Sequence, residues 1–189
     1  MRVSGGTARG KHLSTKGRGG VRPTSGKVAD ALFNSLAARV VDARVLDLFA
    51  GTGRLGIEAL SRGAREAVFV ERDARNVAVI KENLASAGVA ARGAVRRGNA
   101  LIEIAVLAEA GRQFDLIMLD PPYGRGLQRE MLGRVAATTA LAPGGLIIAE
   151  GHWRDTPGEV PGLEQVKSSR YGETAVWVYT RPAKKEDAV

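Results

Sequence analysis

Apolar positions along the chain alternate between helically spaced stripes and short continuous runs. The first stripe places Val28, Leu32 and Leu36 on one side of a predicted helix, with Thr24 or Ser25 available as its N-cap. The runs predict buried strands at 44–49, 67–71, 94–97, 114–119 and 145–150, the last after an Ala-Pro-Gly turn at 142–144. The stripes between the runs predict helices at 55–62, 74–87, 101–110 and 127–141. Alternating residues near the end predict a hairpin of strands 165–169 and 175–180 around Tyr-Gly-Glu.

Strands that alternate with helices predict an α/β fold. The strands are apolar on both faces, so we expect an open, doubly wound, mostly parallel sheet that helices cover on both sides. The hairpin replaces a further strand–helix unit and predicts an antiparallel strand at the far end of the sheet. Strands 44–49 and 114–119 are then neighbours at the switch point, where ligands bind. We expect an N-terminal arm at 1–27, one domain at 28–182 and a disordered tail at 183–189.

The composition excludes several classes of protein. A chain of 189 residues that is 44% hydrophobic and 25% charged has enough apolar material for one globular domain with a core. The absence of cysteine excludes disulfides and Cys-ligated metal sites, and with only two histidines we expect no metal. The chain has no apolar run of about 18 residues. It also lacks the apolar stretch of a signal peptide, so we expect a cytoplasmic protein without membrane contact.

The net charge of +8 is concentrated at the start of the chain. Seven Lys and Arg residues precede the first acid, Asp30, so 21 basic residues remain to balance 20 acidic ones. A nearly neutral domain with a basic, glycine-rich arm is typical of proteins whose arm contacts phosphate groups. The alternative is a solvated tail that only increases solubility. The basic residues of the arm are Arg2, Arg9, Lys11, Lys16, Arg18, Arg22 and Lys27.

A Gly-x-Gly turn joins the strand 44–49 to the following helix. Glycine at 51 and 53 lets the backbone turn tightly and lets a ligand lie against it. With Gly56 the spacing matches the Gly-x-Gly-x-x-Gly pattern, and Glu71 closes the next strand, where it can accept hydrogen bonds from a ribose. The pattern predicts a cofactor that contains adenosine, with a purely structural turn as the alternative.

Charge near this turn favours one adenosine cofactor over another. The pyrophosphate of NAD needs an anion site at the N-terminus of the helix. S-adenosylmethionine has no phosphate, and its sulfonium and ammonium groups are cations. Asp47 places a carboxylate where the pyrophosphate would lie. The sequence therefore favours S-adenosylmethionine modestly.

A second motif, Asp120-Pro121-Pro122-Tyr123, follows the strand 114–119. Consecutive prolines end the strand and fix an extended turn. The Asp120 carboxylate and the Pro121 carbonyl would accept the two hydrogens of a planar exocyclic amine and turn its lone pair toward an electrophile. Pro122 helps to fix that carbonyl, and Tyr123 offers a face on which an extruded base stacks. A simple strand stop is the alternative, but it does not account for the flanking acid and aromatic residue.

Three segments in this order, Asp47–Gly53, Val70–Asp73 and Asp120–Tyr123, resemble those of Rossmann-like amino-methyltransferases that use S-adenosylmethionine. Within that group the chain is similar, over about residues 1–180, to the RsmD family of bacterial 16S rRNA guanine-N2 methyltransferases. The N-terminal features that carry this likeness are Gly5, Arg9-Gly10-Lys11, Leu13, Val21-Arg22-Pro23-Thr24 and Lys27–Asn34.

The resemblance implies a binding mode for S-adenosylmethionine. The methionine part lies at the glycine turn, the ribose at Glu71 and the adenine at Asn99, whose amide serves in place of an aspartate. The implied cofactor-binding residues are Arg22, Thr24, Asp47, Phe49, Ala50, Gly51, Thr52, Gly53, Glu71, Arg72, Asn99 and Ala100. The implied catalytic residues are Asp120, Pro121, Pro122 and Tyr123.

The resemblance also implies an RNA partner, 16S rRNA in the small ribosomal subunit or in an assembly intermediate, for a protein that we expect to be a monomer. Arg54 departs from the small residue that the resemblance predicts after the second glycine, which leaves the local shape of the turn open. The implied RNA-binding residues are Arg2, Arg9, Lys11, Lys16 and Arg18.

Three other functions remain open from the sequence. A DNA adenine or cytosine amino-methyltransferase uses the same tetrapeptide, but such enzymes usually carry a further domain that reads the DNA sequence. An NAD-dependent oxidoreductase fits the glycine pattern and gives Asp-Pro-Pro-Tyr no role. A non-catalytic RNA-binding or ribosome-assembly protein needs the basic arm without the acid at 120. His152 and Trp153 follow the last parallel strand, as packing residues or as part of the rim of the crevice.

Overall fold

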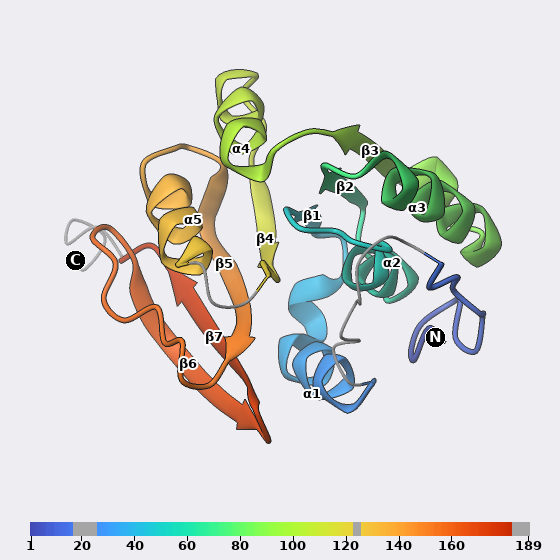
Figure 1. The fold of residues 1–189 in the computed structure, drawn as a ribbon, viewed down its shortest axis with the longest axis horizontal. Helices are drawn as coiled ribbons and strands as arrows, with labels where there is room; N and C mark the ends of the chain where they lie inside the picture. Colours follow the sequence, from blue (N-terminus) through green and yellow to red (C-terminus); the bar gives the residue numbers. More distant parts are fainter. Residues whose placement is uncertain (17–25, 123–125, 183–189) are drawn as a thin grey trace.

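The computed structural model describes residues 1–16, 26–122 and 126–182. In chain order the helices and strands are α1 Gly26–Leu36, β1 Arg44–Asp47, α2 Arg54–Ser61, β2 Glu66–Glu71, α3 Ala74–Ala87, β3 Gly93–Arg97, α4 Ala100–Glu109, β4 Phe114–Leu119, α5 Leu127–Ala136, β5 Leu141–His152, β6 Glu164–Tyr171 and β7 Thr174–Thr180 (Figure 1). Short 3-10 helices cover Ala37–Val40 and Ala90–Arg92. The predicted N-cap at Thr24 or Ser25 and the predicted tail at 183–189 lie outside the described residues.

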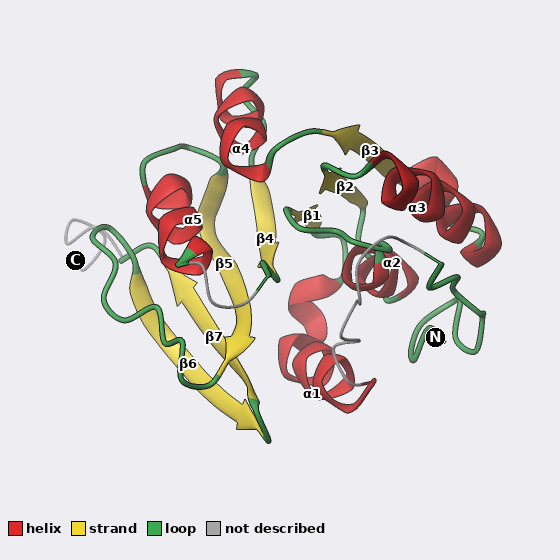
Figure 2. Ribbon diagram, viewed as in Figure 1, coloured by secondary structure: helices red, strands yellow, loops and turns green. Residues whose placement is uncertain are grey.

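Within the described residues, seven strands form one sheet in the order β3-β2-β1-β4-β5-β7-β6 (Figure 2). Strands β1 to β5 are parallel, and β7 pairs antiparallel with both β5 and β6. The predicted α/β fold with its terminal hairpin is therefore confirmed. The antiparallel strand β7 lies one place inside the edge, however, and β6 forms the edge itself. Because β1 pairs with both β2 and β4, the switch point lies between β1 and β4, as predicted.

Helices cover both faces of the sheet because successive side chains of a strand point to opposite sides. On one face, Val45 and Leu116 pack in a cluster with α1, α2 and α3. On the other face, Leu46 and Ile117 pack in a cluster with α4 and α5. These four side chains are at most 1% exposed, so the central strands have no polar face, as their apolar runs predict. No helix in the described part of the chain is long and apolar enough to span a membrane.

The connection between α5 and β5 differs most from the sequence prediction. The predicted helix 127–141 ends at Ala136, and β5 is 12 residues long and starts before the predicted Ala-Pro-Gly turn. The Arg181 side chain donates hydrogen bonds to the carbonyl groups of Val135 and Ala136. These contacts give partners to carbonyls that the end of the helix leaves open. The Ala-Pro-Gly turn becomes an irregularity within β5, where its register against β4 shifts.

The first 16 residues fold back against α2 and α3 (Figure 1). Their buried side chains, each at most 4% exposed, are Val3, Ala8 and Leu13. Glu58 on α2 accepts hydrogen bonds from the backbone NH groups of Ser4 and Gly5, both at 2.9 Å. Apolar and polar contacts thus anchor this N-terminal segment, residues 1–16. The alternative of a solvated tail is wrong for these residues.

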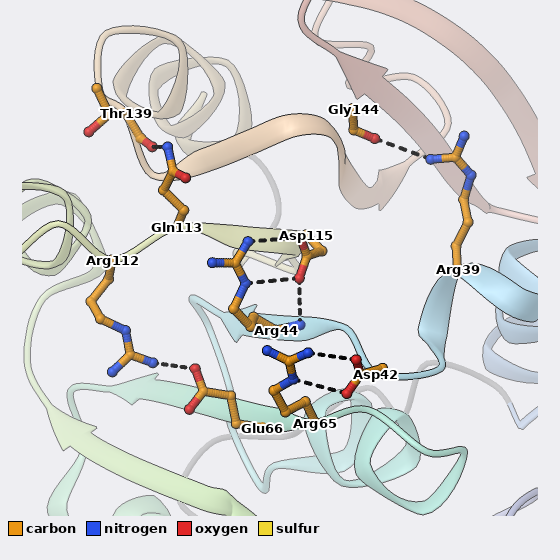
Figure 3. Close-up of polar contacts among 10 residues, drawn as sticks. All are labelled: Arg39, Asp42, Arg44, Arg65, Glu66, Arg112, Gln113, Asp115, Thr139 and Gly144. Atoms are coloured by element: carbon orange, nitrogen blue, oxygen red, sulfur yellow. Dashed lines mark hydrogen bonds and ion pairs between the residues drawn. The ribbon is translucent and has the colours of Figure 1, made fainter.

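Ion pairs join the elements at the amino edge of the sheet, where the parallel strands begin (Figure 3). The Arg44 side chain on β1 donates to both carboxylate oxygens of Asp115 on β4 at 3.0 Å. The backbone NH of Arg44 donates to the same carboxylate at 2.8 Å. Two further pairs at this edge are Arg65 with Asp42 and Arg112 with Glu66. Side chains that are distant in sequence therefore hold the starts of β1, β2 and β4 in place.

Candidate active site

Four carboxyl groups lie at the opposite, carboxyl edge of the sheet. Asp47 ends β1, Glu71 ends β2 and Asp120 follows β4. Glu150 lies beside Asp120 in the parallel register of β4 and β5. In strand order this acidic row is Glu71, Asp47, Asp120 and Glu150, with the switch point at its centre. Among the described residues, no group of three or more acids or histidines is arranged to hold a metal ion.

The glycine turn carries the chain from β1 to α2. Gly53 is the N-cap of α2 with φ 81°, a left-handed conformation that favours glycine. Its NH donates to the carbonyl of Ala50 at 2.6 Å and closes the turn. A Cβ at Gly56 would overlap the Phe69 ring on β2, so glycine lets α2 pack directly on the sheet. The predicted turn is confirmed, and Gly51, with φ 55°, also adopts a left-handed conformation.

Asp47 lies almost fully buried beneath this turn, with 2% of its surface exposed. Its Oδ2 accepts a hydrogen bond from the NH of Gly56, in the first turn of α2, at 3.1 Å. The carboxylate therefore takes the position in which the N-terminus of α2 would hold a phosphate. Burial raises the pKa of Asp47 to about 7, and the charges of Asp120 and Glu71 act in the same direction. A cationic ligand beside Asp47 would stabilise its ionised form.

Glu71 is held by two backbone groups. Its Oε2 accepts a hydrogen bond from the NH of Gly51 at 2.9 Å, and its Oε1 accepts one from the NH of Asp73 at 2.8 Å. A carboxylate has about four lone-pair directions, so both oxygens keep capacity for ligand hydroxyls. Arg72, the next residue, is exposed. The acid predicted to bind a ribose is thus joined directly to the glycine turn.

Asn99 follows β3, one strand beyond Glu71. Its Oδ1 accepts a hydrogen bond from the NH of Leu101 at 3.1 Å and caps α4. The NH of the preceding Gly98 donates to the carbonyl of Glu71 at 3.0 Å. Ala100, the first residue of α4, is buried. The structure therefore brings Asn99 next to the backbone of Glu71, and the amide oxygen of Asn99 already has a backbone partner.

Asp120 is half-buried at the end of β4, Pro121 is buried and Pro122 is exposed. Because β1 and β4 are neighbours, Asp120 lies close enough to Asp47 to raise its pKa. The other predicted residues of the glycine turn that are buried or half-buried are Phe49, Ala50 and Thr52. The predicted RNA contacts that the structure describes, all exposed, are Arg2, Arg9, Lys11 and Lys16. The predicted site residues outside the described part of the chain are Arg18, Arg22, Thr24 and Tyr123.

Comparison with known proteins assigns the chain to a family. Residues 1–180 match the family described as conserved hypothetical protein 95. Ribosomal RNA small subunit methyltransferase D of Escherichia coli (strain K12) is 35% identical over 191 residues, which cover 98% of this chain and 92% of that protein. The chain belongs to the RsmD family. The predicted family is thereby confirmed.

Two further proteins illustrate how much of the chain resembles other RsmD-family proteins. The putative rRNA methyltransferase YlbH of Bacillus subtilis (strain 168) is 35% identical over 183 residues, which cover 96% of this chain and 99% of that protein. The solved structure of the putative methyltransferase yhhF from Escherichia coli is 34% identical, with a TM-score of 0.85. The similarity covers 97% of this chain and 99% of that one. The likeness therefore includes the N-terminal segment as well as the sheet.

Arg54 is the first residue of α2 in this RsmD-family chain. The hydrogen bond from the Gly53 NH to the Ala50 carbonyl, which closes the glycine turn, forms even though a large residue follows Gly53. The side chain is half-buried, and burial lowers the pKa of the Arg54 guanidinium. The negative charges of Glu58 and Glu150 raise the pKa of Arg54 and so oppose this shift. The charge of Asp120 also raises it, by a smaller amount. The guanidinium therefore offsets part of the negative charge of the acidic row.

Asn83 is a residue of the candidate site that the sequence analysis missed. Its side chain, 1% exposed, donates to the carbonyl of Thr52 in the glycine turn at 2.8 Å. The same amide accepts a hydrogen bond from the NH of Ser14 at 2.6 Å and donates to the carbonyl of Ser14 at 3.1 Å. One buried amide thus joins the N-terminal segment to the glycine turn. Its sequence signal is a polar residue within the buried stripe of the helix 74–87.

Glu150 is the second residue of the candidate site that the sequence analysis missed. It is 3% exposed, and its backbone carbonyl accepts a hydrogen bond from Nε2 of Gln128 on α5 at 2.6 Å. The available signal was positional, because the apolar run 145–150 ends in an acid as the run 67–71 does. Parallel strands that end in acids place those acids at one edge of the sheet.

Proposed function

We propose that the protein transfers the methyl group of S-adenosylmethionine to the exocyclic N2 amine of a guanine in 16S rRNA. One observation carries the proposal: Asp47, beneath the glycine turn, ends β1, and Asp120, of Asp-Pro-Pro, follows the neighbouring strand β4 close enough to raise the pKa of Asp47. The first favours a cationic adenosine cofactor, and the second can orient a planar amine. Membership of the RsmD family supports the same reaction, since the Escherichia coli relative is named ribosomal RNA small subunit methyltransferase D.

Charge at the glycine turn supports S-adenosylmethionine over NAD. The Asp47 carboxylate already accepts the Gly56 NH at the N-terminus of α2, so a pyrophosphate there would meet a like charge. When bound, S-adenosylmethionine supplies a methyl group that its sulfonium activates. Asp47 stabilises the cationic methionine part, and Glu71 accepts the ribose hydroxyls. Asn99 borders the adenine.

Asp120 and the carbonyl of Pro121 hold the guanine amine. The lone pair of this nitrogen is conjugated with the ring, so the main contribution of the protein is orientation. Two acceptors fix the two hydrogens of the amine, and its lone pair then points in line with the methyl group. The bond from N2 to the methyl carbon forms as the bond from that carbon to sulfur breaks, and Asp120 accepts the proton that N2 loses. The products are N2-methylguanine and S-adenosylhomocysteine.

The N-terminal segment supports an RNA partner. It presents exposed cations while it is anchored on α2, the helix that begins at the glycine turn. Contacts of Lys and Arg with phosphates are independent of sequence, so the shape of the folded or partly assembled small subunit supplies the selectivity. We propose a monomer that acts on this substrate in the cytoplasm. The proposed contacts are Arg2, Arg9, Lys11, Lys16 and Arg18.

The test is methyl transfer from labelled S-adenosylmethionine to unmodified small ribosomal subunits, with naked rRNA and duplex DNA as parallel substrates. Digestion of the products identifies the labelled nucleoside. Label in N2-methylguanosine from the subunit supports the proposal. Label in methyladenine or methylcytosine keeps the amino-methyltransferase chemistry and overturns the guanine substrate. Cofactor binding without transfer to any substrate contradicts the catalytic role.

A further inference from the structure

A cluster of aromatic and cationic side chains lies beyond the end of β5. The guanidinium carbon of Arg170, on β6, is 3.9 Å from the ring centroid of Trp153, and that of Arg154 is 5.0 Å away. The backbone NH of Trp153 donates to the carbonyl of Glu173, in the turn between β6 and β7, at 3.0 Å. Tyr171, beside that turn, is 36% exposed, and both arginines are exposed. We call Trp153, Arg154 and Arg170 the rim cluster.

The rim cluster shares the carboxyl edge of the sheet with Asp120. Glu150 lies beside Asp120 in the register of β4 and β5, and Trp153 follows three residues later. At about 3.3 Å per residue, three residues carry the chain roughly 10 Å from the acidic row. Figure 1 shows the turn between β6 and β7 close to the end of β5. A nucleotide next to a guanine held at Asp120 can reach this position.

The arginines of the rim cluster differ in their partners from those of the amino edge. There, Arg44 and Arg65 each place two nitrogens on a carboxylate. In the part of the chain that the structure describes, neither Arg154 nor Arg170 forms an ion pair. Arg170 donates through Nε to the carbonyl of Gly172 at 2.8 Å, which fixes its guanidinium against the indole.

Stacked guanidinium groups of this kind fit a single-stranded nucleic acid. An arginine whose guanidinium carbon lies over an aromatic ring keeps terminal N–H donors that match two oxygens of a phosphate. Aromatic faces bind unpaired bases without regard to their identity. In a duplex, the faces of the bases are occupied by their neighbours, so they cannot stack on protein side chains. The rim cluster therefore offers both groups that an unpaired nucleotide needs.

We propose that the rim cluster binds an unpaired nucleotide adjacent to the target guanine, with its phosphate on Arg154 and Arg170 and its base against the half-buried indole of Trp153. The proposal deepens the proposed function, on which it rests, because it defines the substrate as RNA that is single-stranded around the modified base. It adds a binding surface that is separate from the N-terminal segment.

The test compares the binding of a short single-stranded RNA oligonucleotide with that of its duplex, by fluorescence anisotropy over a range of salt concentrations. The variant carries Arg154→Ala and Arg170→Ala. We expect single-strand binding to weaken about tenfold and the salt dependence of log Kd to fall by about 1.4, or about 0.7 for each phosphate that the variant no longer neutralises. The matched control carries Arg39→Ala and Arg134→Ala, two exposed arginines away from the rim, and changes Kd less than twofold.

Two further measurements keep the proposal falsifiable. Arg170→Lys keeps the charge and loses the planar stack, so its affinity should lie between those of the wild type and the double variant. Melting temperatures establish that each variant is folded. Equal affinities of the double variant and the control overturn the proposal. So does an equal loss of single-strand and duplex binding, because that result indicates phosphate attraction alone.

Methyl transfer to small subunits, measured on the same proteins, separates this proposal from the proposed function. An active wild type whose double variant has a raised KM and an unchanged kcat supports both. An active wild type with unchanged oligonucleotide binding and KM in the double variant overturns the rim site and leaves the reaction intact. A third outcome is a wild type that transfers no methyl group but binds single strands, while the double variant binds them weakly and the control does not. That outcome overturns the reaction and supports the rim cluster as a binding surface.

Discussion

The two edges of the sheet use carboxyl groups in opposite ways. At the amino edge, the Arg44 guanidinium holds the pKa of Asp115 below its ordinary value, and Arg65 does the same for Asp42. At the carboxyl edge, the pKa of Asp47 is raised to about 7 by burial, and its hydrogen bond comes from a backbone NH. Asp42, just before β1, and Asp47, at the end of β1, thus meet opposite surroundings.

This difference separates stability from chemistry within one sheet. A carboxylate that is paired with an arginine at both oxygens has its charge offset by that cation, and its contribution is to fix neighbouring strands. Glu71, held by backbone NH groups, keeps acceptor capacity toward the crevice. Burial of Asp47 and Glu150 at the carboxyl edge costs free energy that the folded protein retains. We infer that a cationic cofactor and an amine recover part of this cost on binding.

The sharpest test of the comparison is Asp120→Asn, at the carboxyl end of β4. The amide keeps the size of the side chain, but it replaces one acceptor with a donor and cannot take up the proton of the guanine amine. We expect kcat for methyl transfer to fall at least about a hundredfold. Binding of S-adenosylhomocysteine, measured by calorimetry, should remain within a few-fold of the wild type. A variant with a nearly normal rate would remove Asp120 from the mechanism.

The positions that carry these roles differ in how visible they are in the sequence. Glu71 was predicted as the acid that closes one apolar run after the glycine pattern, and Asp120 as the acid of the Asp-Pro-Pro-Tyr motif that follows another. Strand ends converge at one edge in a parallel sheet. Asn83 was not predicted, because its hydrogen-bond partners are Ser14 and Thr52. No local sequence pattern indicates contacts between residues so far apart in the chain. The end of α5 was missed for the same reason, since Arg181 is distant in sequence.

Asp47→Asn tests the charge at the carboxyl edge through pH. The pKa of Asp47 is about 7 in the folded protein and has an ordinary value of 3.8, so the folded state holds the proton more tightly. Ionisation therefore lowers wild-type stability as the pH rises between these values, and stability changes little above about 7. Denaturant unfolding should show that Asp47→Asn gains stability relative to the wild type at alkaline pH and not at acidic pH.

The same group predicts a pH dependence of cofactor binding. Ionised Asp47 attracts the ammonium group of S-adenosylhomocysteine, so wild-type affinity should decrease as the pH falls below about 7. In Asp47→Asn the affinity should be weaker at alkaline pH and nearly constant between pH values on either side of 7. Parallel pH profiles for the two proteins would contradict a charge role for Asp47.

Asn83→Ala asks whether the carboxyl edge depends on the N-terminal segment. The substitution leaves the Thr52 carbonyl and the Ser14 NH without their partner in a buried setting, at a cost of about 1–3 kcal/mol for each group that water cannot reach. We expect weaker S-adenosylhomocysteine binding and a lower melting temperature. The matched control is Ser86→Ala, on the same helix, which removes a hydrogen bond to the His12 carbonyl rather than one to the turn. Equal cofactor affinities in the two variants would deny Asn83 a role in positioning the turn.

Asp115→Asn should have the smallest effect, and on stability alone. Asp115 lies near the start of β4, and Asp120 follows the end of the same strand. The Asp115 carboxylate binds Arg44, and the Asp115 side chain is 38% exposed. Loss of this half-exposed pair should cost about 1 kcal/mol and lower the melting temperature by roughly 3 °C. Because the pKa of Asp115 is lowered, its contribution exists at neutral pH and is lost in acid, where the variant and the wild type should converge. The rate of methyl transfer per folded molecule should not change; if it falls as in Asp120→Asn, the two edges do not divide stability and chemistry between them.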